Sequence, residues 1–166
     1  MSKLTDYELT IIRFTTAILA YVMNADGDAM KPEERARLMT FLGKYVSHGQ
    51  MSHSQVQKTV ADAQKIIGTT PFADFIASRT IKELYPGQRL AVYINAVDAC
   101  LVDDVLAGGQ TSELEALRRA LDIDLDTAKA IKQVFMVKNS GAVLGDILHP
   151  TNAAKAPMRL HMTKVE

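Results

Sequence analysis

The stretch from Ile11 to Met23 constrains the fold most, because its apolar side chains leave almost no polar face. Thr5 and Glu8 have the spacing of a capping box, which predicts that this helix begins near Asp6. A helix that is apolar nearly all round belongs in a protein interior. The run is interrupted by Arg13 and is shorter than the ~20 apolar residues needed to cross a bilayer. The sequence therefore predicts a buried helix of a folded domain.

The segment from Leu90 to Leu106 has the same character and predicts a second interior helix. No stretch shows the apolar–polar alternation of a half-buried strand. We therefore expect an all-α fold, a compact bundle of about seven helices with two similar halves around two buried central helices. The domain is expected to cover residues 1–148, followed by a loosely ordered tail over residues 149–166. Further helix starts are expected near Pro32, Ser52, Thr70, Ser112 and Asp124.

The charge balance and the cysteine content indicate which partners and which cellular compartment to expect. The 19 basic residues equal the 19 acidic ones, so the chain lacks the positive charge with which proteins bind nucleic acid non-specifically. The acidic Asp6 and Glu8 stand where an export signal would be basic, and the single cysteine, Cys100, cannot form an internal disulfide. These features predict a cytoplasmic protein. Cys100 lies in an apolar helix and is expected to be a buried small side chain rather than a nucleophile.

The loop after the first interior helix is acidic. Asp26 and Asp28 flank Gly27, and Glu34 lies in the first turn of the next expected helix, within reach of the loop. Hard cations such as Ca²⁺ and Mg²⁺ prefer oxygen ligands, and clustered carboxylates repel unless a cation or proton neutralises them. The spacing is not that of an EF-hand, because Glu34 comes too early to close such a loop. Turn formation and helix capping without a ligand are the alternative interpretation.

The loop after the second interior helix repeats this pattern in weaker form. Asp104 corresponds to Asp26, Glu113 corresponds to Glu34, and each glutamate precedes a leucine by four residues. A pseudo-twofold would bring the C-terminal ends of both interior helices to one side of the molecule. Helix C-termini carry partial negative charge, so a cation would be favoured there. We therefore expect one shared acidic pocket built from both halves.

An apolar helix, an Ala-Asp-Gly-Asp loop, a Pro-Glu-Glu helix start and a leucine four residues later resemble the TerB family of tellurite-resistance proteins. The resemblance covers Asp6 to Lys138. It implies an all-helical domain with a divalent-metal role in bacterial stress responses, in the cytoplasm or at the inner face of the membrane. The second loop lacks the Asp-Gly pair, so a divergent member is expected. The candidate ligands for Ca²⁺ or Mg²⁺ are Asp26, Asp28, Glu34, Asp104 and Glu113.

Other constellations are weaker. His48 and His53 flank a loop but have no cysteine or carboxylate at zinc spacing beside them. Gly108-Gly109 lacks the lysine of a P-loop and predicts a flexible joint. Neither an activated nucleophile nor an oriented acid–base pair can be identified, so no catalytic activity is expected. The alternative function is a helical module that binds a protein partner or itself, with no nucleic acid and no transmembrane segment; peripheral membrane contact stays open.

Overall fold

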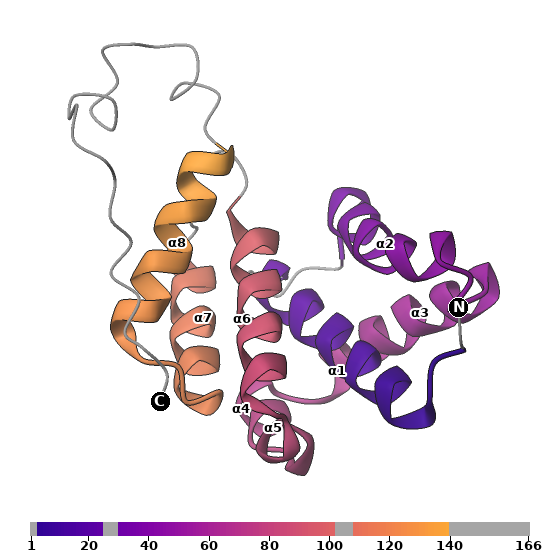
Figure 1. The fold of residues 1–166 in the computed structure, drawn as a ribbon, viewed down its shortest axis with the longest axis horizontal. Helices are drawn as coiled ribbons and strands as arrows, with labels where there is room; N and C mark the ends of the chain where they lie inside the picture. Colours follow the sequence, from indigo (N-terminus) through magenta and orange to yellow (C-terminus); the bar gives the residue numbers. More distant parts are fainter. Residues whose placement is uncertain (1–2, 25–29, 102–107, 140–166) are drawn as a thin grey trace.

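The computed structural model describes residues 3–24, 30–101 and 108–139, and these ranges contain helices and no strands (Figure 1). The predicted all-α class is therefore confirmed. Six helices have 13 to 18 residues, and two have five residues each. They are α1 (Asp6–Met23), α2 (Pro32–Ser47), α3 (His53–Thr69), α4 (Phe72–Ile76), α5 (Arg79–Glu83), α6 (Pro86–Cys100), α7 (Gly108–Ala120) and α8 (Leu125–Asn139).

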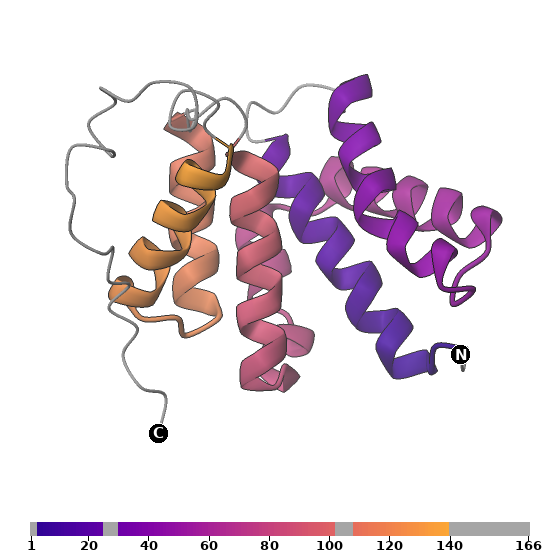
Figure 2. The same ribbon diagram turned by 45° about the horizontal axis from the view of Figure 1, so that its top comes forward.

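Helix α1 is the centre of the bundle. Every residue from Phe14 to Met23 is buried, as the apolar pattern predicts, whereas Arg13 is exposed. The capping box is also present, with the Thr5 N–H 2.7 Å from Glu8 Oε2. Helices α3 and α6 pack along α1 on either side (Figure 2). Each large apolar side chain buried in this way contributes about 1.5–3 kcal/mol, so α1 dominates the stability of the core.

Helix α6 is the second central helix, but it is buried on one face only. It begins at Pro86, several residues before the expected start at Leu90, because proline suits the first position of a helix. Its half-buried residues include Asn95 and Asp98. The part of the expected helix that follows Leu101 lies outside the described residues. The buried residues of α6 are Val92, Tyr93, Ala96, Val97 and Cys100.

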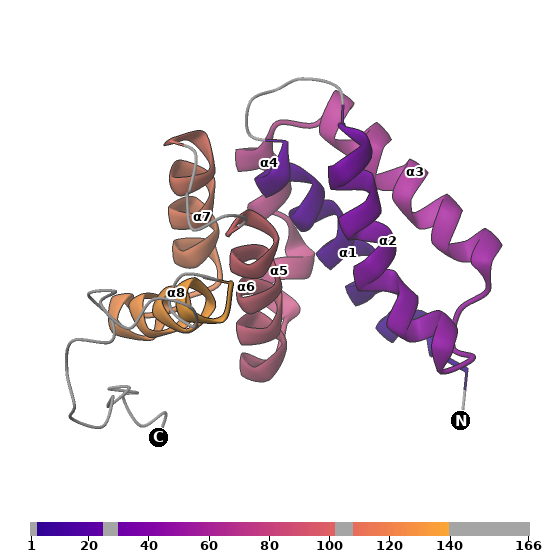
Figure 3. The ribbon, with the colours of Figure 1, turned by 90° about the horizontal axis from the view of Figure 1, so that it is seen from above.

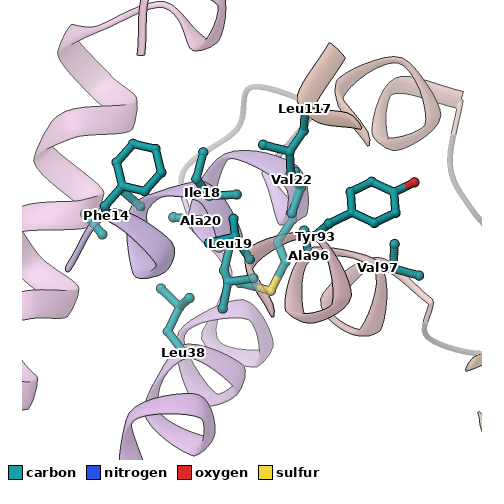
Figure 4. Close-up of a cluster of buried hydrophobic side chains, with 14 of the residues drawn as sticks. Phe14, Ile18, Leu19, Ala20, Val22, Leu38, Tyr93, Ala96, Val97 and Leu117 are labelled. Carbon is teal, nitrogen blue, oxygen red and sulfur yellow. The ribbon is translucent and has the colours of Figure 1, made fainter. Parts of the chain in front are cut away.

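The helices form two groups around α1 and α6. Seen from above, α2 and α3 lie beyond α1, and α7 and α8 lie beyond α6 (Figure 3). Leu38 of α2 and Leu117 of α7, the leucines that follow the two glutamates, are both fully buried in the shared core (Figure 4). The groups differ in that α2 packs along α3 more extensively than α7 packs along α8. The structure thus shows one pair of helices beyond each central helix (Figure 3), and the closer likeness of the two halves stays a prediction.

The boundary between α3 and α4 differs from the sequence-based expectation. Helix α3 continues through Gly68 to Thr69, and Thr70 ends it rather than starting the next helix. The Tyr21 hydroxyl donates a hydrogen bond to the Thr70 carbonyl at 2.5 Å, which ties this corner to α1. Phe72 lies against the Tyr21 ring, with ring centroids 5.1 Å apart. Packing on α1 therefore decides where α3 ends.

Helix α7 also begins before its expected start near Ser112. Gly108 and Gly109 are helical rather than a joint, so Ser112 lies inside α7 and does not cap it. Glycine weakens a helix interior by about 1 kcal/mol, a cost that burial of the Leu117 face can offset. The expected cap of α8 is correct, since the Thr127 N–H donates to Asp124 Oδ1 at 2.8 Å.

Residues 140–166 lie outside the described residues, and with them the expected tail over 149–166. Among the helices that the structure describes, none is both long enough and apolar enough to cross a membrane.

Candidate functional site

The C-terminal ends of α1 and α6 lie together at one end of the bundle. The Cys100 thiol, at the last residue of α6, donates to the Val22 carbonyl near the end of α1 at 3.6 Å. Arg37 of α2 donates from Nη1 to the Ala99 carbonyl at 3.0 Å, so α2 reaches the same place. Residues 25–29 and 102–107, which lie outside the described residues, follow these helix ends in the sequence. The described helix ends therefore have the arrangement that the pseudo-twofold argument predicted.

The structure describes two of the five predicted ligands. Asp26, Asp28 and Asp104 lie outside the described residues, whereas Glu34 and Glu113 lie within them. Over residues 3–24, 30–101 and 108–139, no three His, Cys, Asp or Glu side chains form a group that could hold a metal ion. The described part of the chain thus supplies single carboxylates at this end of the bundle rather than a complete ligand set.

Glu34 has a structural role. Its side chain is buried, and Oε2 accepts a hydrogen bond from the Lys31 N–H at 2.8 Å. This bond satisfies one of the free N–H groups at the start of α2, and the negative charge is favourable at a helix N-terminus. The capping alternative is therefore observed for Glu34. A cation would have to share Oε2 of Glu34 with this hydrogen bond or bind the other carboxylate oxygen.

Glu113 has a different environment, although the sequence repeat pairs it with Glu34. Because α7 begins at Gly108, Glu113 lies beyond the first turn and cannot cap the helix. Its Oε2 is buried without a hydrogen-bond partner in the described part of the chain, and burial raises the pKa of Glu113 to about 7. Its charge also contributes, after burial, to the raised pKa values of Tyr21 and Cys100, which places it beside the ends of α1 and α6. Glu113 therefore places a buried oxygen acceptor at this end of the bundle, and no described residue donates a hydrogen bond to its Oε2.

Asn24 supplies a second oxygen at the same end. It directly follows α1, and its backbone N–H donates to the Ala20 carbonyl at 3.0 Å. Its side-chain Oδ1 is buried and has no hydrogen-bond partner among residues 3–24, 30–101 and 108–139. An unsatisfied buried acceptor costs about 1–3 kcal/mol, which a cation or a hydrogen-bond donor would recover. The only signal for Asn24 in the sequence is its position immediately after an apolar helix.

Cys100 does not add a reactive group to this end. The thiol is 2% exposed, and burial raises its pKa to about 12, with a further contribution from Glu113. The nearby cations Arg37 and Lys132 oppose this increase in pKa but do not reverse it. A thiol that stays protonated is a poor nucleophile and a poor metal ligand. Cys100 is accordingly the buried small side chain that its apolar helix predicted.

Comparison of the chain with protein-family models, curated proteins and solved structures found no match. The resemblance to the TerB family therefore depends on the acidic loops and the helix starts around them.

Proposed function

We propose that this chain is a non-enzymatic, TerB-like helical module of bacterial stress response, of the tellurite- or metal-resistance type, that binds a divalent cation in the cytoplasm. The cation, Ca²⁺ or Mg²⁺, would bind where the ends of α1 and α6 meet the first turns of α2 and the N-terminal half of α7. The observation that carries this proposal is the buried, unpartnered Oε2 of Glu113.

Oxygen chemistry supports a hard cation at this place. Glu113 offers Oε2 of its carboxylate and Asn24 offers the neutral Oδ1, and neither atom has a hydrogen-bond partner among the described residues. The sequence adds Asp26, Asp28 and Asp104 in the segments that follow α1 and α6. Ca²⁺ takes roughly six to eight oxygen ligands, so these residues, with water, would have to contribute together. Such a site would also relieve the mutual repulsion of the carboxylates.

Because protons and the cation would compete for the Glu113 carboxylate, we expect cation affinity to depend on pH. A cation needs the ionised form of Glu113, whose pKa is raised to about 7 by burial. Binding near neutral pH should therefore release a proton, and affinity should rise between about pH 6 and pH 8. A site formed only by exposed aspartates would have little pH dependence in this range.

Calorimetric titration of the chelator-treated protein with Ca²⁺, Mg²⁺, Mn²⁺ and Zn²⁺ tests the proposal. We expect saturable binding at about pH 8 that is weakened by Glu113→Gln and by Asp26→Asn. Glu115→Gln is the matched control, because Glu115 lies on the same helix but pairs with Arg118 and Arg119 at 2.8 and 2.9 Å. The absence of binding by the wild-type protein for all four cations would refute the cation site.

The absence of catalysis is a separate part of the proposal. In the described ranges, the one thiol is buried and protonated, and no oriented acid–base pair accompanies Glu113. Phosphatase, esterase and peptidase substrates should give only background rates. A metal-dependent activity that Asp26→Asn abolishes would overturn this part.

The alternative function, a protein-interaction module, is favoured by the outer surface of α8. Leu125 and Met136 are 51% and 47% exposed, although both are large apolar residues. Their separation of 11 positions corresponds to about three helical turns, so they share one face. Sedimentation of the wild-type protein and of Met136→Lys would test self-association through this face. Concentration-dependent association that Met136→Lys abolishes, without any cation binding, would favour the alternative.

A further inference from the structure

A groove of about 270 Å³ lies between α2 and α6, with α1 as its floor. Leu19 and Met23 of α1 give it an apolar base. Its walls are two helices from different halves of the molecule, so the groove exists only because the halves pack together. The lining residues from the walls are Arg37, Leu38, Thr40, Phe41 and Lys44 of α2 and Asn95, Asp98 and Ala99 of α6.

The two walls of the groove carry different charges. On the α2 wall, Lys44 Nζ lies 4.6 Å from the centre of the Phe41 ring, and burial lowers the pKa of Lys44. On the α6 wall, Asp98 is paired with Lys138 of α8 at 3.0 Å. Because Asp98 already has a charged partner, a new opposite charge in the groove would stabilise the charged form of Lys44 more than that of Asp98. The groove suits an apolar segment that carries a carboxylate on the side facing α2.

Helix α8 ends at the rim of this groove. Lys138 binds Asp98, which itself lines the groove, and Asn139 donates from Nδ2 to the Leu101 carbonyl at 2.8 Å. These two bonds fix the last residues of α8 next to the C-terminal end of α6 (Figure 2). The sequence continues from there with residues 140–166. The last described residue of the chain, Asn139, therefore lies close to the groove.

We propose that the segment Val143 to Leu148 of the same chain docks into the groove between α2 and α6. Its four large apolar residues fall at positions i, i+1, i+4 and i+5, which form one side of a single helical turn and a half. Asp146 is the only charged residue of the segment and would pair with Lys44. Three residues connect the segment to α8 and can span roughly 10 Å, which is enough to reach the rim at Asp98. This proposal does not depend on the cation site.

Disulfide trapping in the full-length chain tests the docking. Thr40→Cys on the groove wall is combined with Ile147→Cys, and the control combines Gln57→Cys, exposed on α3, with the same tail cysteine. Cys100 can stay because it is buried. A docked segment keeps the two thiols at high effective concentration, so the groove pair should form an intramolecular disulfide roughly tenfold or more faster than the control pair.

Two further variants show what holds the segment. Leu144→Asp in the groove pair should reduce the rate to that of the control pair, because a carboxylate would enter an apolar floor. Lys44→Asp should slow trapping, and combining it with Asp146→Lys should restore the rate. Equal rates for the groove and control pairs would overturn the proposal. Disulfide-linked dimers as the main product of the groove pair would also overturn it, because the occupant would then be a second copy.

Discussion

Replacing Glu113 by glutamine should stabilise the protein at alkaline pH and leave its stability nearly unchanged in acid. Burial raises the pKa of Glu113 from its ordinary value of 4.5 to about 7, so the folded state disfavours the ionised form. Below about pH 4 the carboxyl is protonated in both the folded and the unfolded state and carries no penalty. Between the two pKa values the unfolded chain ionises first, and stability falls. Above about pH 7 the full penalty is present.

The size of the effect follows from the two pKa values. A change from 4.5 to about 7 in a fully buried group would correspond to ~3 kcal/mol. Glu113 is only partly buried, and solvent screens its charge, so we expect roughly 1–2 kcal/mol at pH 8. Glutamine keeps the shape of the side chain and removes the charge, so the gain measures mainly the cost of ionisation.

Chemical unfolding of Glu113→Gln and the wild-type protein at about pH 4 and pH 8, without divalent cations, measures this difference. Glu115→Gln is the control with the opposite sign, because two arginines lower the pKa of Glu115 to about 2 and its loss should destabilise the protein at pH 8. A destabilised Glu113→Gln at pH 8, or an equal effect at both pH values, would refute the reasoning. When a saturating divalent cation is added, we expect it to stabilise the wild-type protein more than Glu113→Gln.

Three further outcomes test the core, the thiol and the C-terminal region. Ile18→Ala should cost about 2–5 kcal/mol in chemical unfolding, because Ile18 is fully buried in α1, whereas the exposed Val134→Ala should stay within about 0.5 kcal/mol. Cys100 should resist a thiol reagent at about pH 8 until the protein is unfolded, since its pKa is raised to about 12; rapid labelling of the native protein would contradict this. Removal of residues 150–166 should change the melting temperature by no more than about 2 °C, and a larger loss in calorimetry would reveal stabilising contacts.

Local signals in the sequence were sufficient to identify most of the helices and several of their starts, but not the short α5 (Arg79–Glu83). The capping boxes at Thr5 and Ser52 and the cap at Asp124 depend on residues three positions apart, and all three are present. Helices α6 and α7 begin earlier than the sequence predicts, at Pro86 and Gly108, and each includes a glycine in its first turn. A glycine in a helix costs little compared with the burial of a whole helix face, and that burial depends on the partner helices.

The sequence by itself determined the all-α class, the buried α1 and the presence of an acidic residue after each central helix. It also paired Glu34 with Glu113, since both precede a buried leucine by four residues. Only the tertiary structure distinguished the two: Glu34 satisfies the N-terminus of its own helix, whereas Glu113 is held beside the ends of α1 and α6 without a partner for Oε2. Capping depends on neighbours in sequence, but the solvation of a carboxylate depends on which other helices surround it, and that is decided only when the two halves pack together.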